Sequence, residues 1–451
     1  MKNAKFITGS PFKHIFYMSS TSTIALTFLF LVDFLDLFYL SLLGQQSVTA
    51  AIGFATIIYF FSVSVSIGLS IAMSALVAKS VGQGRFAVAK LFVTHISIVA
   101  ILVSILITIF MWSNIINLLS MIGAKGEALY LARDYLTILL PVIPVMTLAM
   151  SLGATLRAVG DGKLSMLSTM IGSIVNAVID PIFIFTFDMG IEGAAIATVI
   201  SHFIVLAIAV YGVHLKHKMF ADFDLAIFKR DFKIIFAIAL PAILTNVATP
   251  FGTAYISYEI AAMGDDFIIG FSAISRITPI AFGIFFAMSG AIGPIIGQNY
   301  GAGLMDRVKD SLTSALLFCC AYVSLCSLML YLLQDVIIQF FNLSDDSASV
   351  VVLFCNVLAI TFIFNGMMFI ANAVFNNLGK PQYSMFCNIA KATIGTIPFV
   401  FFGAKIAGVE GILIGQALGT IFFGIGTVVV AFYLIALETK NTAWVTETTT
   451  A

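Results

Sequence analysis

The sequence predicts an all-α membrane protein whose twelve transmembrane helices form two pseudo-symmetric six-helix lobes. Three observations support this fold class: the hydropathy of the chain, the placement of basic residues in its loops, and a repeat between its halves. Of the 451 residues, 61% are hydrophobic and 10% are charged, and the mean hydropathy is +1.09. Soluble domains carry about 25% charged residues. This composition therefore excludes a soluble cytosolic enzyme.

The apolar segments are long enough to cross a bilayer, which requires about 20 residues in a helix. Charged residues, Gly and Pro separate twelve such segments. They lie at residues 15–43, 48–78, 88–112, 129–153, 164–187, 191–213, 234–263, 267–300, 310–333, 347–376, 383–404 and 409–437. The first is too long for the apolar part of a signal peptide, and no small-residue cleavage site follows it, so we expect no cleavable signal.

The loop charges predict the orientation of these spans, because Lys and Arg near span ends favour the cytoplasmic side. Seventeen of the 22 basic residues fall on one side of the predicted bilayer. We therefore expect a multi-pass protein of the plasma (inner) membrane with both termini in the cytoplasm. Basic and acidic residues balance at 22 each, so the chain has no net charge that would attract nucleic acid.

A repeat relates the two halves of the chain, which the polar stretch 214–233 divides into six spans each. Three pairs of segments align: Gly68–Gln83 with Gly283–Gln298, in which six of 16 positions are identical, Ser165-Met166 with Ser384-Met385, and Gly190–Gly193 with Gly408–Gly411. Because six is even, both halves run in the same direction, and we expect the repeat axis along the membrane normal. The expected domains are a lobe at 1–213, a cytoplasmic linker at 214–233, a lobe at 234–437 and a cytoplasmic polar tail at 438–451.

Charged side chains inside a bilayer cost roughly 2.5–3.5 kcal/mol each on insertion scales and usually mark function. Six of those in the predicted spans are candidates for such a role: Asp33, Asp36, Asp180, Glu259, Arg276 and Lys391. Asp36 and Asp180 each precede an outer-loop residue by eight positions, so both are expected roughly 12 Å below the outer helix ends. Asn176 is one turn before Asp180, and Thr198 lies at about the same level on the next span.

These four residues suit a coupling cation. Two carboxylates, an amide and a hydroxyl match Na⁺, which prefers oxygen ligands, and they also match a proton, because adjacent carboxylates repel and one of them is then readily protonated. A structural cluster of buried hydrogen bonds is the alternative. The second half lacks the set: Ile256 stands at the position of Asp36, Gly395 at that of Asn176, and Phe399 at that of Asp180. This asymmetry favours a coupling site confined to the first half.

The remaining charged residues leave alternatives open. Asp33 either faces a central cavity or joins the network of Asp36. Glu259 either lines the cavity as a carboxylate for cationic substrates or extends outward to the interface. Arg276 and Lys391 either line the cavity or pair with acids or backbone carbonyls. The histidines show no ligand spacing, and phosphate-binding loops and catalytic triads are absent from the sequence, so we expect no cofactor, no ATP-driven pump and no enzyme.

A series of motifs resembles the multidrug and toxic compound extrusion (MATE) family of secondary transporters over nearly the whole chain. They are Leu35-Asp36, Leu43-Gly44, Ala51–Phe54, Gly82-Gln83, Ala158–Asp161 through Ser165, Asn176–Phe185, Gly190–Thr198, Ala239–Pro241, Ala273–Ile277 and Gly297–Gly301. The resemblance implies a V-shaped cavity between two lobes, and efflux of organic, often cationic, compounds coupled to inward Na⁺ or H⁺. It also implies that the ion binds at Asp36, Asn176, Asp180 and Thr198, with Tyr135 near them.

The chain departs from this family at two places. Thr21 stands where the first span usually carries a proline, whereas Pro241 retains the second-half counterpart. Pro250 lies where some members carry an acidic residue in the seventh span. The resulting hypothesis is a monomeric, cation-coupled multidrug antiporter for small organic substrates in the bilayer. The alternative is a flippase for a lipid-linked saccharide, which would require a strongly basic cavity that only Arg276 and Lys391 can supply.

Overall fold

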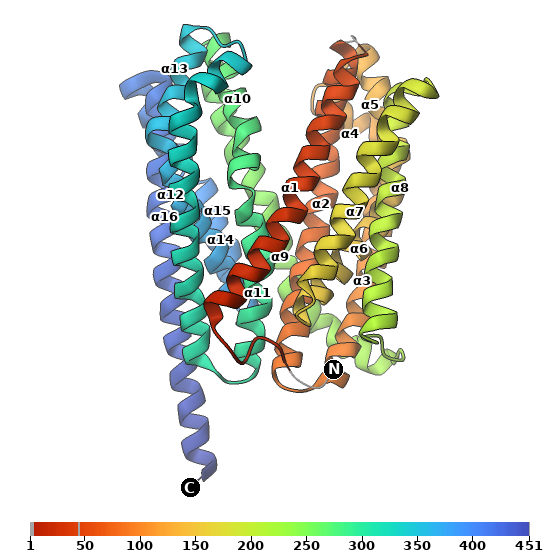
Figure 1. Cartoon of the computed structure of the whole chain (residues 1–451), viewed down its shortest axis with the longest axis vertical. Helices are drawn as coiled ribbons and strands as arrows, with labels where there is room; N and C mark the ends of the chain where they lie inside the picture. Colours follow the sequence, from red (N-terminus) through yellow and green to blue (C-terminus); the bar gives the residue numbers. More distant parts are fainter. Residues whose placement is uncertain (1–3, 44–45, 451) are drawn as a thin grey trace. The chain divides into compact units, whose positions relative to one another are not determined.

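The computed structural model describes residues 4–43 and 46–450, which form helices joined by short turns and, in this part of the chain, no strand (Figure 1). The helices are α1 (Pro11–Ser41), α2 (Gln46–Gly82), α3 (Phe86–Ser113), α4 (Ile115–Met121), α5 (Gly126–Leu139), η1 (Leu140–Val142), α6 (Ile143–Ala158), α7 (Gly162–Pro181), η2 (Ile182–Thr186), α8 (Gly190–Val210), η3 (Tyr211–Lys216), α9 (Leu225–Ala261), α10 (Asp265–Phe282), α11 (Ile284–Gly301), α12 (Met305–Phe340), α13 (Asp345–Leu353), η4 (Phe354–Leu358), η5 (Ala359–Thr361), α14 (Phe362–Asn377), α15 (Pro381–Ala392) and α16 (Ile397–Thr450).

Eleven stretches within the described residues are long and apolar enough to cross a membrane. The last of them, Pro381–Asn441, has 61 residues and contains two passes. It breaks inside α16, where Ala407 and Gly408 leave the helical conformation and Gly408 has a φ of 57°. Glycine adopts such a positive φ more readily than any other residue. The predicted all-α fold with twelve membrane-spanning helices is therefore confirmed.

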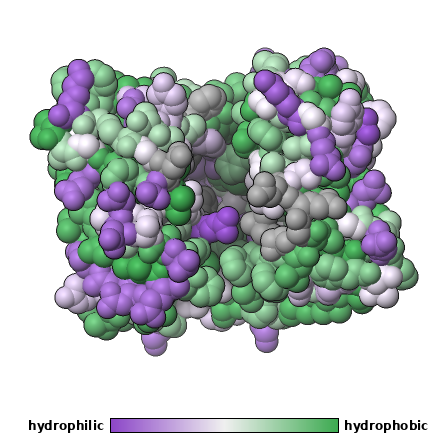
Figure 2. Space-filling model, turned by 90° about the horizontal axis from the view of Figure 1, so that it is seen from above, coloured by the Kyte–Doolittle hydropathy of each residue, from purple (hydrophilic) through white to green (hydrophobic). Residues whose placement is uncertain are grey.

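The described surface has the polarity that a bilayer requires. Large apolar side chains are exposed along the helices, among them Leu106 and Phe110 on α3 and Phe422 and Val429 on α16. Hydrophilic residues gather at helix ends, as Figure 2 shows for the ends at the top of Figure 1. Lipid tails cannot solvate polar groups, so this distribution fits an embedded protein.

The chain forms two compact units. Unit 1 consists of Met1–Lys5 and Ser20–Asn246, and unit 2 consists of Phe6–Ser19 and Val247–Ala451. Two long helices, α1 and α9, therefore contribute residues to both units. In unit 1, α2 packs against α3, α5 and α6, and α7 packs against α8. In unit 2, α14 packs against α11, α12 and α16, and α10 packs against α13.

The backbone repeats its turns in the two halves. Four pairs of residues with positive φ correspond to one another: Gly84 with Gly303, Gly123 with Asn342, Gly160 with Gly379, and Gly190 with Gly408. The first three pairs are 219 residues apart in the sequence and the last is 218 apart. Left-handed backbone is costly for most L-residues, so its recurrence at a constant offset supports the internal repeat that the sequence motifs indicated.

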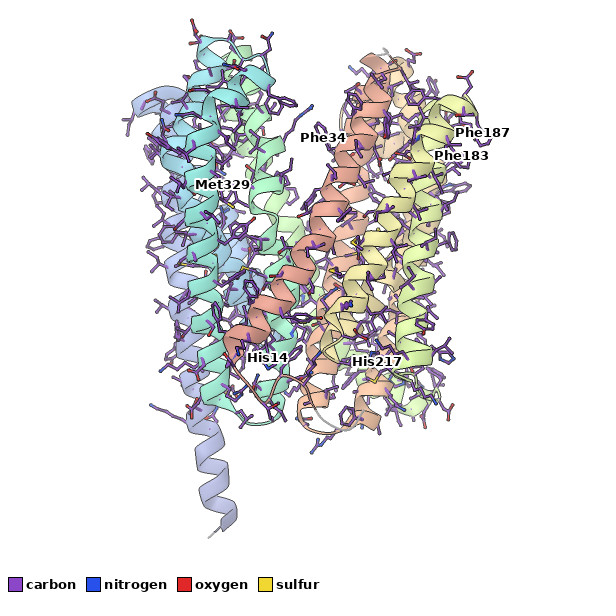
Figure 3. All side chains as sticks on the ribbon, in the orientation of Figure 1. His14, Phe34, Phe183, Phe187, His217 and Met329 are labelled. Carbon is purple, nitrogen blue, oxygen red and sulfur yellow. The ribbon has the colours of Figure 1, made fainter. Side chains whose placement is uncertain are left out.

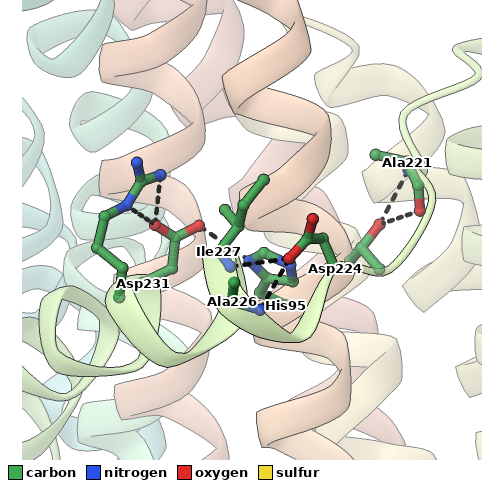
Figure 4. Close-up of polar contacts among 8 residues, drawn as sticks. His95, Ala221, Asp224, Ala226, Ile227 and Asp231 are labelled. Atoms are coloured by element: carbon green, nitrogen blue, oxygen red, sulfur yellow. Dashed lines mark hydrogen bonds and ion pairs between the residues drawn. The ribbon is translucent and has the colours of Figure 1, made fainter.

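The segment between the two sets of spans is bound to unit 1 (Figure 4). The Thr94 hydroxyl on α3 bonds both the N–H and the carbonyl of Ala221, at 2.9 and 3.1 Å. His95 Nδ1 lies 2.9 Å from Asp231 Oδ2, and both side chains are buried. Asp224 accepts hydrogen bonds from the first N–H groups of α9, so this helix begins inside the stretch 214–233 that we expected as a linker.

The N-terminal segment is bound to unit 2 through its backbone. The Phe6 N–H donates to Gln298 Oε1 at 2.9 Å, and Asn299 Nδ2 donates to the Phe6 carbonyl at 3.2 Å. The Arg307 guanidinium donates to the carbonyls of Phe6 and Gly9, at 3.0 Å each. Gln298 and Asn299 are fully buried. These contacts explain why residues 6–19 belong to the second unit although they precede the first.

Candidate cation site in unit 1

Two carboxyl groups meet inside unit 1. Asp36 lies in the last third of α1, and Asp180 is the next-to-last residue of α7. Asp180 is fully buried and Asp36 is half-buried. The two carboxyl groups lie close enough to interact with each other. Two ionised carboxylates repel each other at short range, so this arrangement favours a proton on one of them or a cation between them.

One oxygen of each carboxyl group is buried without a protein donor. Among the residues that the structure describes, Asp36 Oδ1 and Asp180 Oδ2 have no hydrogen-bond partner. A buried polar atom of this kind costs about 1–3 kcal/mol, and more when it is charged. A bound proton or cation would remove that cost, because it would neutralise the charge and occupy the free lone pairs.

The amide expected at this site is present. Asn176 is buried, and its Nδ2 donates to Asp180 Oδ1 at 3.5 Å, one helical turn away. Pro181 ends α7 and has no N–H for the carbonyl one turn before it. The π-helical turn η2 follows, with Phe183 and Phe187 near the end of unit 1 opposite His217 (Figure 3). The helix is thus irregular directly beside the carboxyl pair.

The other two predicted residues lie on the neighbouring helices. Thr198 is half-buried on α8, and its hydroxyl donates to the Ala194 carbonyl of the same helix at 3.1 Å. Tyr135 is half-buried on α5, packs against the hydrophobic core of unit 1, and interacts electrostatically with Asp36 and Asp180. Tyr135 is therefore beside the carboxyl pair, whereas the hydroxyl of Thr198 bonds its own helix.

The remaining candidates do not form one cluster. Asp33 is exposed on α1 and interacts electrostatically with Asp36. Glu259, Arg276 and Lys391 belong to unit 2. Glu259 is half-buried and hydrogen-bonds Tyr255 one turn before it. Arg276 is exposed and Lys391 is half-buried.

Two residues near the site were missed by the sequence analysis. The Tyr59 hydroxyl on α2 lies 3.1 Å from His202 Nε2 on α8 and 3.0 Å from Met146 Sδ on α6. His202 follows Thr198 by four residues, so both lie on the same face of α8. That spacing in the sequence indicates that His202 lies near Thr198. The absence of a metal-ligand spacing among the histidines gives no such indication.

The described residues also show which further ligands a Na⁺ ion would need. Within the described residues, no group of three or more His, Cys, Asp or Glu side chains is arranged to bind a metal ion. A Na⁺ ion at the carboxyl pair would need further oxygen ligands from the Asn176 amide, the Thr198 hydroxyl or backbone carbonyls. A proton needs no such ligands.

The comparisons with known proteins agree with this fold. The MatE family model matches residues 22–182 and 241–402, one match in each half. The FAD transporter of Shewanella oneidensis is 26% identical over 94% of this chain and 95% of its own length. The multidrug export protein MepA of Staphylococcus aureus is 22% identical over 90% of this chain and 91% of its own.

Solved structures extend the agreement to three dimensions. The outward-facing structure of a multidrug resistance MATE family transporter of the MOP superfamily superposes with a TM-score of 0.91. It is 22% identical and covers 98% of this chain and 99% of its own. At this identity the likeness shows the fold, while the family match over both halves shows the relationship. The chain belongs to the MatE family and is a multi-pass membrane transporter, not an enzyme.

Proposed function

We propose that the protein is a multidrug efflux antiporter, which exports organic, often cationic, compounds in exchange for H⁺ or Na⁺ by alternating access. The carboxyl pair of Asp36 and Asp180 carries this proposal. Two oxygens of the pair are buried without a hydrogen-bond donor among the described residues, which favours the binding of a cation. Asn176, Thr198 and Tyr135 would complete the site.

Coupling requires only that the cation bind the two conformations of the transporter differently. Cation binding at the pair would favour the inward-facing arrangement after the substrate has left. We place the protein in the plasma (inner) membrane as a monomer, with both termini in the cytoplasm. The basic residues in the loops support this orientation.

The substrate has two candidate classes. MepA is named as a multidrug export protein, which favours organic cations. The relative from Shewanella oneidensis is named as an FAD transporter and matches 94% of this chain. FAD is an anion, and Arg276 and Lys391 are basic residues within the spans of unit 2. The names of these relatives give no support to a lipid-linked saccharide as substrate.

The test uses the purified protein in liposomes with an imposed pH or Na⁺ gradient, and ethidium and FAD as probes. We expect the wild type to move one probe against its concentration gradient only when an ion gradient is present. Asp36→Asn should bind that probe with unchanged affinity but lose gradient-driven transport, because an amide can neither release a proton nor neutralise a cation.

The matched control is Glu192→Gln, which removes an exposed carboxylate from the first turn of α8 in the same unit. We expect it to transport as the wild type does. Gradient-driven transport by Asp36→Asn at the wild-type rate would contradict the coupling role of the pair. Movement of ethidium alone or FAD alone would decide the substrate class.

A further inference from the structure

Beside the carboxyl pair, unit 1 contains a second group of polar side chains. It consists of Tyr59 on α2 and His202 on α8, with Met146 of α6 against the tyrosine hydroxyl. Both Tyr59 and His202 are half-buried. Tyr59 also interacts electrostatically with Asp33. We refer to Asp33, Tyr59 and His202 as the inner layer.

The inner layer lies about one helical turn from the carboxyl pair. The end of α1 and the start of α8 are neighbours, since a Cβ on Gly190 would lie 3.9 Å from Leu43. His202 is four residues further along α8 than Thr198, which is about 6 Å, and Asp33 is three residues further from this end than Asp36, which is about 4.5 Å. Both steps lead away from the outer end and into the membrane.

The Tyr59 hydroxyl can hydrogen-bond His202 in two arrangements. A thioether accepts hydrogen bonds but cannot donate them. When the hydroxyl donates to Met146 Sδ, its oxygen accepts from an N–H at His202 Nε2; when it rotates, it donates to an unprotonated Nε2 instead. The hydroxyl hydrogen therefore has an acceptor whether or not Nε2 is protonated.

Electrostatic interactions link the inner layer to the carboxyl pair. Tyr135 on α5 interacts electrostatically with Tyr59 and with Asp33, Asp36 and Asp180. The helices that pack against α8 include α5, α6 and α7. Of these, α5 contributes Tyr135 and α7 contributes Asp180, while α6 contributes the neutral Met146. The helices that pack against α8 thus carry an acid and a phenol, and His202 itself contacts the Tyr59 phenol.

From this geometry we infer that His202, oriented by Tyr59, is a second proton-binding residue on the inward path of the coupling ion, which is therefore H⁺. In this step a carboxylic acid of the pair loses a proton and becomes a carboxylate, and the His202 imidazole gains that proton and becomes an imidazolium. No other bond changes, and the total charge is conserved. A phenol, an imidazole and a thioether form a poor site for Na⁺, which prefers oxygen ligands. The inference rests on the proposed antiport function.

The test measures proton movement and probe binding separately. Purified protein is placed in liposomes that contain a pH-sensitive dye, and the probe that the wild type transports, ethidium or FAD, is added. We expect His202→Gln to bind the probe with the wild-type affinity, because it can still hydrogen-bond Tyr59. Its probe-driven proton movement should fall to the level of protein-free liposomes, because an amide cannot take up the proton. The pH dependence of the coupling rate should disappear with it.

Two further variants make the result decisive. Tyr59→Phe keeps the ring in the core and removes only the hydroxyl, and we expect slower proton movement with unchanged probe affinity, even if His202→Gln does not fold. His214→Gln is the matched control, since this histidine is exposed on η3 at the end of the same span. It should behave as the wild type does.

The outcomes separate this inference from the proposed function. Loss of coupling in Asp36→Asn with full proton movement in His202→Gln and Tyr59→Phe would overturn the inference alone. Exchange of the probe for Na⁺ and not for H⁺ in the wild type would also overturn it and leave the antiporter standing. Full coupling in Asp36→Asn would overturn the proposed function, and with it the inference.

Discussion

At Asp180 in α7, unit 1 buries a carboxyl group beside that of Asp36. At the corresponding place in unit 2, Phe399 stands in the first turn of α16, and a Cβ on Gly415 would lie 2.3 Å from its carbonyl oxygen. The position of Asn176 is likewise taken by Gly395, whose carbonyl oxygen would lie 1.5 Å from a Cβ on Gly419. The same location in the repeat therefore holds polar side chains in unit 1 and direct backbone contact in unit 2.

The corresponding helices therefore meet different requirements in the two units. Glycines let two membrane helices approach until their backbones touch, which maximises van der Waals contact. A buried carboxyl group needs the opposite, namely space for itself and for a cation or a hydrogen-bond partner. Near the start of α8, unit 1 keeps the close contact, since a Cβ on Gly193 would lie 2.8 Å from the Phe183 carbonyl.

The largest effect on folding should come from breaking the glycine contact in unit 2. In Gly419→Ala the added Cβ meets the Gly395 carbonyl oxygen at 1.5 Å, which only a shift of the backbone can relieve. Overpacking typically costs 1–3 kcal/mol and occasionally more, so we expect loss of most of the folded protein. Size-exclusion chromatography and thermal unfolding in detergent measure this loss.

The control for that variant is Gly426→Ala on the same helix, where an added Cβ would have no neighbour within 4 Å. We expect no loss of folded protein there. Equal melting temperatures of the two variants would show that the close contact is not what holds this pair of helices together.

A smaller effect on stability should come from a serine hydrogen bond that occurs at corresponding positions in the two units. Ser165 Oγ accepts from Arg157 Nη1 at 2.9 Å, and 219 residues further on the Ser384 hydroxyl is shared between Asn376 Oδ1 and the Asn372 carbonyl, at 3.3 Å each. Hydrogen bonds to charged groups contribute roughly 1.5–3 kcal/mol and neutral ones roughly 0.5–1.5 kcal/mol. Ser165→Ala should therefore destabilise the protein more than Ser384→Ala does.

Thermal unfolding of the two serine variants in the same detergent tests this order. Arg157 Nε already has no hydrogen-bond partner among the described residues, so removal of Ser165 leaves the guanidinium with still less compensation. A larger loss of stability in Ser384→Ala would mean that the charge of Arg157 is compensated by water.

Hydropathy and loop charge were sufficient to predict the twelve spans, because each span is a local property of about 20 residues. The residues Asp36, Asn176 and Asp180 were also accessible, since their depth follows from counting along a helix. Tyr59 and His202 were not accessible in this way. They meet across α2 and α8, and no local pattern in the sequence specifies which faces of two helices separated by more than 100 residues are in contact.

The exchange of segments between the units was equally hidden. The segment before the first span belongs to unit 2 and not to unit 1, which follows it directly in the sequence. This assignment depends on side chains such as Gln298 and Arg307, which lie almost 300 residues away from the segment. In the sequence, the contact of Gly395 with Gly419 is visible only as the absence of an amide at the position of Asn176. Its reason, the close approach of two backbones, became clear from the three-dimensional packing.

The smallest predicted effect concerns an ion pair that occurs at corresponding positions in the two units. The acidic and the basic residue of the pair are interchanged between the units. Asp161, between α6 and α7, accepts from His217 at 2.8 Å and from Lys216 at 2.7 Å, whereas at the corresponding place in unit 2 Lys380 lies 3.7 Å from Glu438. The hydrogen bond from His217, followed by that from Lys216, holds the pKa of Asp161 well below its usual range. Because the folded-state pKa is lowered, the contacts stabilise the protein above the ordinary pKa of an aspartate, about 4, and this stability is lost as the pH falls further.

Asp161→Asn isolates this contribution, because asparagine can still accept the hydrogen bond from the Leu164 N–H at the start of α7. Lys216 is half-exposed, so we expect a loss of only about 1 kcal/mol at pH 7. The difference in melting temperature between wild type and variant should persist down to about pH 5 and shrink below about pH 4. A difference that persists unchanged at low pH would mean that Asp161 acts through its shape and its helix cap, and that the opposite polarity of the two units has no energetic consequence.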